Sequence, residues 1–157
     1  LALGAPQTNL LVNRYGSFRG TITGRASRVQ WSFGDGTVVT NSGSSINHQW
    51  TNTGDSFVMF TAYNMDNPDG VSTNLVIHVL PPDPPQLQSV VMASNAFQLQ
   101  FTGQAGVFYD IQVTTNLAPP VYWQILQSFY NSTDGVRQIS DSGAVSNVTR
   151  FYRVQAR

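Results

Sequence analysis

Apolar and polar residues alternate along most of this chain with a period of two. The alternation is clear over residues 18–23, 28–33 and 74–79 in the first half, and over residues 97–102 and 109–114 in the second half. Such alternation predicts half-buried β-strands that turn one face toward a core. No stretch keeps a 3.6-residue period, so we expect essentially no helix.

A proline-rich segment divides the chain into two parts of similar size. Residues 81–85 read Pro-Pro-Asp-Pro-Pro. Proline has no backbone N–H to give to a sheet and favours a stiff, extended spacer. Residues 1–80 and 86–157 each have the length of a small β-sandwich, and turn residues punctuate both. We therefore predict an all-β chain of two immunoglobulin-like β-sandwich domains in tandem, joined by a linker over residues 81–85.

Composition excludes several classes of function. All eight basic residues are arginine and all eight acidic residues are aspartate, so no surplus of positive charge is present to neutralise nucleic-acid phosphates. No run approaches the roughly 18 apolar residues of a membrane span. The chain has no cysteine for a disulfide, a zinc–thiolate site or a thiol nucleophile. The low charge is typical of an extracellular or cell-surface β-protein, and we expect the C-terminal part of a larger secreted or surface protein.

A motif in the first half carries a family resemblance. Residues 31–36 read Trp-Ser-Phe-Gly-Asp-Gly, residues 48–50 read His-Gln-Trp, and residues 61–64 read Thr-Ala-Tyr-Asn, followed by Gly70. On these residues the chain resembles the PKD (polycystic kidney disease) domain family over about residues 6–80, with tryptophan at position 50 where the family pattern has tyrosine. The resemblance implies a seven-stranded immunoglobulin-like sandwich, found mostly in extracellular proteins as a spacer or adhesion module.

We interpret the motif residues as structural. Two aromatic residues of one strand point inward, and the Gly-Asp-Gly segment turns the chain after them, with its carboxylate holding backbone N–H groups. The later histidine is expected to be a buried, hydrogen-bonding residue close to this turn. The residues with these assigned roles are Trp31, Phe33, Gly34, Asp35, Gly36, His48 and Trp50.

The second half has a looser pattern. Residues 97–103 read Phe-Gln-Leu-Gln-Phe-Thr-Gly, residues 109–117 contain Tyr-x-Ile-x-x-Thr-Thr-Asn-Leu, and residues 150–154 read Arg-Phe-Tyr-Arg-Val. With Trp123 between them, these segments resemble fibronectin type III-like C-terminal modules of secreted bacterial proteins. The resemblance implies a second β-sandwich over residues 86–157.

Few residues are suited to catalysis or metal binding. The histidines are His48 and His78, and no Gly-x-Ser-x-Gly segment positions a nucleophilic serine, so we predict no catalytic residue. We interpret His78 as a solvated residue on an edge-like strand. Asp66 and Asp69, with Asn64 and Asn67, gather oxygen ligands that calcium accepts, but such clusters also build ordinary turns. We therefore predict no cofactor, with calcium at this turn as the alternative.

Two surfaces are candidates for binding. The strand over residues 57–63 is apolar on both faces, and if its even-numbered residues face the core, Phe57, Met59 and Tyr63 face outward. Such a patch indicates contact with another protein domain or a second copy of the chain. Tyr122 and Trp123 are adjacent, so one of them should be exposed; they are the candidate carbohydrate contact, with Tyr122 the better exposed of the two.

These features predict a non-catalytic structural or adhesion module that makes protein or surface contacts. A carbohydrate-binding accessory module, with polysaccharide as the partner, is the first alternative. The second alternative is a subunit of an extracellular filament, in which residues 1–12 are donated as a strand to a neighbouring copy.

Overall fold

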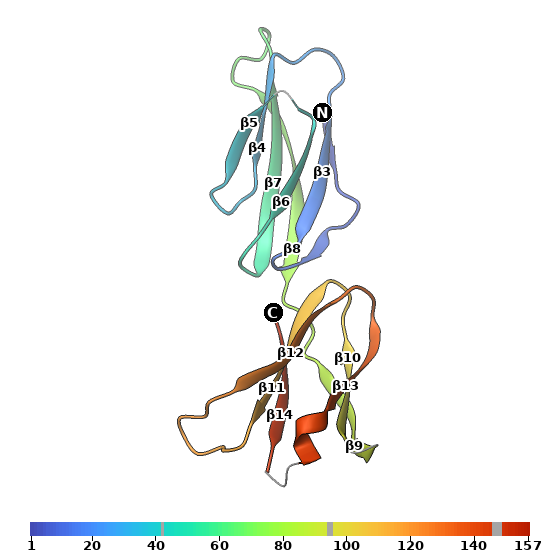
Figure 1. Ribbon diagram of the computed structural model, residues 1–157. Coiled ribbons are helices and arrows are strands. Elements are labelled where there is room, and N and C mark those ends of the chain that lie inside the picture. The colour runs from blue at the N-terminus through green and yellow to red at the C-terminus, as the bar shows by residue number, and fades with distance from the viewer. Residues whose placement is uncertain (42, 94–95, 146–148) are drawn as a thin grey trace. The chain divides into compact units, whose positions relative to one another are not determined.

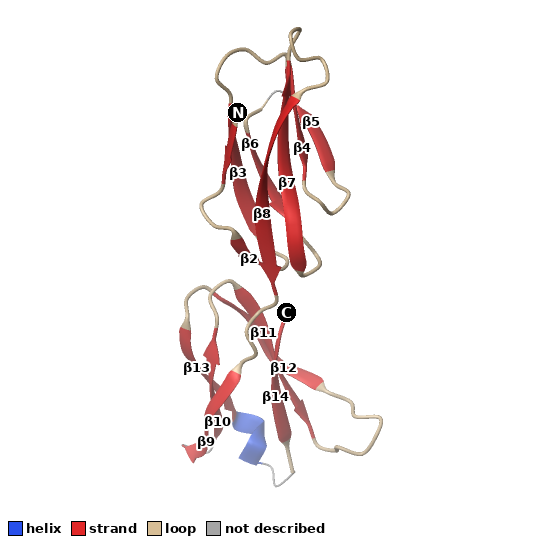
Figure 2. Cartoon of the chain, turned by 180° about the vertical axis from the view of Figure 1, so that it is seen from behind, coloured by secondary structure: helices blue, strands red, loops and turns tan. Residues whose placement is uncertain are grey.

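The computed structural model describes residues 1–41, 43–93, 96–145 and 149–157. The chain divides into two compact units, Leu1–Pro81 and Pro82–Arg157, and each is a β-sandwich (Figure 1). The prediction of an all-β fold is confirmed, because the described elements are strands apart from one turn of 3₁₀ helix, η1 (Ser142–Val145), blue in Figure 2. No helix in the described part of the chain is long and apolar enough to cross a membrane.

The first unit packs a three-stranded sheet against a five-stranded sheet. The strand order is β1-β3-β6 in the smaller sheet and β2-β8-β7-β4-β5 in the larger one. Neighbouring strands are antiparallel except β2 and β8, which are parallel. The strands are β1 (Ala2–Gly4), β2 (Asn9–Leu11), β3 (Tyr15–Thr21), β4 (Arg28–Ser32), β5 (Val38–Asn41), β6 (Ser45–Gln49), β7 (Gly54–Tyr63) and β8 (Val71–Leu80).

Residues 1–12 contribute a strand to each of these sheets. Leu3 of β1 pairs with Gly20 of β3, and Leu10 of β2 pairs with Val79 of β8. The N–H of Val12 extends the second pairing by donating to the Leu80 carbonyl at 2.9 Å. The backbone of this segment is therefore paired inside its own domain, and the prediction that residues 1–12 are donated to a neighbouring copy is wrong.

The core of the first unit lies between the two sheets. Alternation places Phe18 inward on β3, between exposed Ser17 and Arg19, as the sequence pattern predicts. Gly20 also faces inward, and it leaves room for the ring of Phe60, because a Cβ at position 20 would lie 2.2 Å from Cε1 of that ring. The buried apolar residues of this core are Phe18, Val29, Trp31, Phe33, Trp50, Val58, Phe60, Ala62, Ile77 and Val79.

The second unit is built from two three-stranded sheets, with strand orders β13-β10-β9 and β12-β11-β14. All of its pairings are antiparallel, and β11 is the central strand of its sheet. Its buried apolar side chains are Leu99, Phe101, Val107, Tyr109, Ile111, Val113 and Ile139. The strands are β9 (Gln86–Ala93), β10 (Ala96–Gly103), β11 (Val107–Thr114), β12 (Gln124–Asn131), β13 (Gly135–Asp141) and β14 (Phe151–Ala156).

The boundary between the units falls within the segment predicted as the linker, between Pro81 and Pro82. No strand covers residues 81–85, as expected where proline removes backbone donors. The N–H of Asp83 donates to the side-chain oxygen of Gln104 at 2.8 Å. The middle of the proline-rich segment is thus attached to the second unit.

Candidate functional site

The Trp-Ser-Phe segment forms the centre of the first core. Trp31 on β4 and Phe33 just after it are fully buried, with near-parallel rings whose centroids lie 6.3 Å apart. The Trp31 ring also packs on Phe60 of β7 at 4.5 Å, and its Nε1 donates to the Gly43 carbonyl at 3.4 Å. These aromatic residues are fully buried in the core and are not available to a ligand.

The Gly-Asp-Gly turn after β4 has a backbone that requires glycine. Gly34 and Gly36 have φ of +77° and +91°, which residues with a Cβ rarely adopt. A Cβ at Gly34 would in addition lie 2.8 Å from the backbone nitrogen of Phe57. Asp35 Oδ1 accepts a hydrogen bond from the Thr37 N–H at 2.9 Å, which closes the turn.

His48 connects this turn to β6. Its Nε2 lies 2.7 Å from Asp35 Oδ2, while its ring stacks on Phe33 at 3.9 Å and meets the edge of Trp50 at 4.6 Å. Burial raises the pKa of Asp35, but hydrogen bonds from the Thr37 N–H and from His48 outweigh it and hold that pKa below its ordinary value of 3.8. The pair therefore stabilises the turn as an ionised carboxylate with a bound imidazole.

Trp50 follows β6 and joins the same cluster. It is buried, and its Nε1 donates to the Phe33 carbonyl at 3.1 Å. The tyrosine of the family pattern is thus replaced by a residue whose ring packs edge-on against Phe18 and Phe33.

An open cavity of about 490 Å³ borders the Asp35–His48 pair and is also lined by Thr37, Thr51 and Thr53. A nucleophilic relay needs a hydroxyl hydrogen-bonded to the histidine. Among the described residues, the only side-chain hydrogen bond of His48 is the one to Asp35. The described geometry therefore contains no serine or threonine relay at this histidine.

The position of the second histidine, His78, differs from the predicted one. His78 lies on β8, which is flanked by β2 and β7 and is not an edge strand. Its Nδ1 lies 2.7 Å from Asp55 Oδ1, and both side chains are exposed. His78 is thus solvated, as predicted, but on an interior strand and with a carboxylate partner.

The candidate contact patch divides into an exposed part and a covered part. Phe57 is 59% exposed and Met59 is 40% exposed, while the alternate residues of β7 face the core. Tyr63 is half-buried: the Arg28 guanidinium lies 3.8 Å above its ring, and its hydroxyl donates to Gln30 Oε1 at 2.7 Å. Phe57 and Met59 therefore present free apolar surface, and Tyr63 does not.

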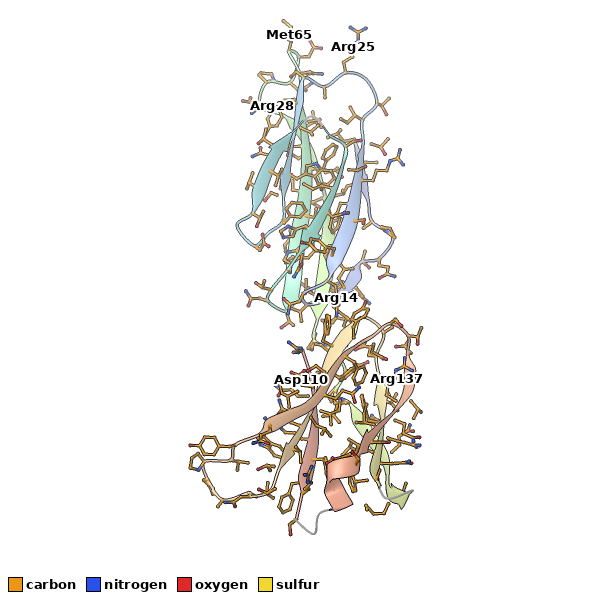
Figure 3. All side chains as sticks on the ribbon, in the orientation of Figure 1. Arg14, Arg25, Arg28, Met65, Asp110 and Arg137 are labelled. Carbon is orange, nitrogen blue, oxygen red and sulfur yellow. The ribbon has the colours of Figure 1, made fainter. Side chains whose placement is uncertain are left out.

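The turn considered for calcium is organised by its own hydrogen bonds. Asn64 Oδ1 accepts from both the backbone N–H and the side-chain Nδ2 of Asn67, at 2.8 and 3.0 Å. Asp66 and Asp69 are exposed, beside Met65 at the tip of the turn (Figure 3). No group of three or more His, Cys, Asp or Glu side chains that could hold a metal ion occurs in the described part of the chain.

Tyr122 and Trp123 have different surroundings in the second unit. Tyr122 is 79% exposed, whereas Trp123 is half-buried with the Arg153 guanidinium 4.4 Å above its ring. Tyr122 lines a cavity of about 300 Å³ at the hairpin between β11 and β12. The pair thus follows the expected division, with Tyr122 presented to solvent.

The second unit contains an ionic cluster at Asp141 that was not predicted from the sequence. This buried carboxylate accepts hydrogen bonds from Arg150 Nη1 at 2.6 Å, the Tyr152 hydroxyl at 2.8 Å and the Gly143 N–H at 2.9 Å. Burial raises the pKa of Asp141, but these bonds outweigh it and lower the pKa below 3.8, while burial and the carboxylate raise the pKa of Tyr152 to about 12. The sequence did contain a signal for this cluster. Asp141 follows Ile139 by two residues and so lies on the core side of the same strand, where a carboxylate needs partners.

Two further buried polar groups of the second unit were not predicted from the sequence. Asn131 is fully buried; its Nδ2 donates to the carbonyls of Gln104 and Thr133, and its Oδ1 accepts from Arg137 Nε. Asp110 accepts from the Ser128 hydroxyl at 2.5 Å and lies 3.1 Å from Arg157 Nε. Figure 3 labels Asp110 and Arg137 within the second unit.

The comparisons with known proteins identify the first unit. Residues 3–77 match the family model of the PKD domain. No curated protein matches the chain. One solved structure, from work on the structural basis for the promiscuous specificity of carbohydrate-binding modules from the β-sandwich superfamily, is similar with a TM-score of 0.46 and 10% identity, covering 99% of this chain and 94% of that chain.

The match confirms the resemblance predicted from the motif at residues 31–36, while the fibronectin type III resemblance of the second half stays a prediction. The match also agrees with the two packed sheets and the buried motif residues of the first unit. Residues 3–77 of this chain therefore form a PKD domain.

Proposed function

We propose that this chain is a non-catalytic extracellular adhesion module that associates with a second copy of itself through its PKD domain. PKD domains are typically extracellular adhesion-type modules. The contact surface is the outer face of the five-stranded sheet. The reactive-looking groups support a non-catalytic role, because His48 and Asp35 stabilise a turn, and Asp141 and Arg150 form an ion pair.

The observation that carries this proposal is the apolar centre of that outer face. Phe57 stands opposite Val76 of β8, and Met59 stands opposite Ser32 of β4, which in turn pairs with Val38 of β5. Val38 is 53% exposed, similar to Phe57 and Met59. Exposed apolar residues that gather on a sheet face, here around the polar Ser32 and Asn74, indicate a contact site when the core already lies on the other side of the sheet. We call this surface the outer apolar face: Val38, Phe57, Met59 and Val76.

Charge placement favours a second copy as the partner. Asp55 lies near one end of β7, and Arg28 lies beside Tyr63 at the other end, with Met59 midway between them. A twofold axis that lies between the two outer faces, parallel to the sheet and at right angles to β7 at Met59, makes the two copies of β7 antiparallel. It then brings Asp55 of each copy toward Arg28 of the other, with only uncharged residues of β7 between them.

The size of the face sets the strength of the contact. Residues 55–63 of β7 span about 26 Å, and five strands span about 19 Å, which gives roughly 500 Å² per copy. Stable interfaces bury roughly 800 Å² per partner. The self-association is therefore weak and appears at high protein concentration.

The test is analytical ultracentrifugation of the whole chain over a range of concentrations. The wild-type chain should show a monomer–dimer equilibrium, and Met59→Asp should weaken it at least about tenfold, because a carboxylate cannot be buried unpaired. Met65→Asp is the matched control, since Met65 is 97% exposed and lies outside the face. A wild-type chain that stays monomeric, or a Met59→Asp variant that dimerises normally, contradicts the proposal.

A charge-reversal pair tests the partner and its orientation. Asp55→Arg alone should weaken the dimer, because it places two arginines together across the interface. Adding Arg28→Asp should restore association in the double variant. If the double variant dimerises no better than Asp55→Arg, the antiparallel arrangement is wrong.

A further inference from the structure

The hairpin between β11 and β12 encloses a cavity of about 300 Å³ in the second unit. Figure 2 shows this connection as a long tan loop between the two strands. The end of β11, the loop and the start of β12 contribute to its lining, together with Arg150. Its volume is at the lower end of the roughly 300–1,000 Å³ of small-ligand sites. The cavity can therefore hold a small ligand but not a folded segment of protein.

An exposed aromatic ring forms one wall of this cavity. Tyr122 is 79% exposed, although a side chain of this size ordinarily packs against something. No aromatic or cation–π contact involves Tyr122 among the residues described. Its ring is thus available as a flat apolar surface at a polar cavity.

The polar lining consists mainly of neutral amides and hydroxyls. Asn116 Oδ1 accepts the Ala118 N–H at 2.8 Å, which orients the amide and leaves Nδ2 as a donor. The side chains of Thr115 and Gln124 are exposed and make no hydrogen bond to another described residue. These groups supply hydrogen-bond donors and acceptors in the cavity that Tyr122 also lines.

The one charged residue in the lining is compensated. Arg150 Nη1 donates to Asp141 Oδ2 at 2.6 Å, so its charge is neutralised by a buried carboxylate. Arg150 Nε is buried and has no hydrogen-bond partner in the described part of the chain, although buried donors are ordinarily paired. The cavity therefore offers hydrogen bonds without a net charge to attract an ionic ligand.

We infer that this cavity binds one sugar residue of an uncharged polysaccharide. A sugar ring has an apolar C–H face that fits the exposed ring of Tyr122, and a rim of hydroxyls that both donate and accept hydrogen bonds. Thr115, Asn116 and Gln124 provide the matching neutral groups. An anionic glycan gains no ion pair with an uncompensated cation here, because Asp141 already neutralises the charge of Arg150. This site lies outside the PKD domain and is independent of the proposed self-association.

Affinity electrophoresis of the whole chain tests the inference. The gels contain dextran, mannan, xyloglucan or a soluble β-glucan, with hyaluronate as the anionic comparison. The wild-type chain should be retarded by at least one of the four neutral polymers, and not by hyaluronate. Tyr122→Ala should weaken this binding by about tenfold, since stacking and burial of an aromatic ring are lost.

One control variant and one further cavity variant accompany Tyr122→Ala. Tyr15→Ala removes a tyrosine that is 72% exposed on β3 of the PKD domain, outside the cavity, and should bind as the wild type does. Gln124→Ala should also reduce affinity without lowering the unfolding temperature. The inference is overturned if no neutral polymer retards the wild-type chain, or if only hyaluronate does. It is also overturned if Tyr122→Ala and Tyr15→Ala bind equally well, or if Tyr122 binds a peptide in place of a glycan.

Discussion

The close approach of Gly20 to Phe60 makes a sharp test of the PKD core. In Gly20→Ala, the new Cβ would lie 2.2 Å from Cε1 and 2.5 Å from Cδ1 and Cζ of the Phe60 ring. This ring is fully buried, and Trp31 packs on it at 4.5 Å, so it has little freedom to move away. A methyl group must therefore displace either the ring or strand β3.

The magnitude follows from the severity of this overlap. Carbon atoms pack at about 3.5–4.0 Å, so the overlap exceeds 1 Å. Overpacking a core by a methyl group destabilises by about 1–3 kcal/mol, and we take the upper end here. Alanine reduces the entropy of the unfolded chain, which returns about 0.4–1 kcal/mol. The net loss of about 2 kcal/mol lowers the Tm of a domain of this size by roughly 8–16 °C.

Thermal unfolding followed by tryptophan fluorescence measures this loss, since Trp31 and Trp50 lie in the PKD domain. Gly4→Ala is the matched control: Gly4 lies on β1 and pairs with Arg19, and a Cβ there meets nothing within 4 Å. Combining Gly20→Ala with Phe60→Leu should recover part of the stability lost, because the smaller side chain relieves the overlap. A Tm for Gly20→Ala within about 2 °C of that for Gly4→Ala would refute the reasoning.

Four other outcomes follow from the structure. The carboxylate of Asp141 has a lowered pKa, so its stabilising effect is present above pH 3.8 and is lost as the pH falls through its folded pKa; urea unfolding should show a gap between the wild type and Asp141→Asn that narrows in acid. Asp35→Asn weakens the bonds to His48 and should destabilise the PKD domain by about 1 kcal/mol in the same assay. Asn131→Ala leaves buried polar partners unpaired and should lower the stability of the second unit by about 1–3 kcal/mol. Millimolar calcium should leave the Tm unchanged, because the turn at residues 64–70 is closed by its own hydrogen bonds.

Local pattern was enough to predict the strands and the arrangement around the Gly-Asp-Gly turn. Alternation placed Phe18, Trp31 and Phe33 inside, because a half-buried strand has only two faces. The turn needs glycine wherever its φ is positive, and its aspartate bonds within two residues along the chain. Such constraints act between residues that are close in the sequence, so short sequence patterns are enough to predict them.

Long-range pairing was not visible in the same way. The sequence treated Tyr63 as part of an exposed patch, but cross-strand register puts Arg28 beside it, 35 residues away. The ion pair between Asp110 and Arg157 likewise forms only when β14 pairs with β11, so no local pattern indicates it. His78 was misplaced on an edge because nothing local shows that β2 pairs with β8.

That parallel pairing has a consequence for a domain pulled at both ends. The chain enters β2 at Asn9 and leaves β8 at Leu80, which are opposite ends of the paired segment because the two strands run in the same direction. Tension along the chain then loads the backbone hydrogen bonds between β2 and β8 in shear, so all of them carry the load at once and they cannot break one after another. The domain resists extension until the hydrogen bonds between β2 and β8 break together.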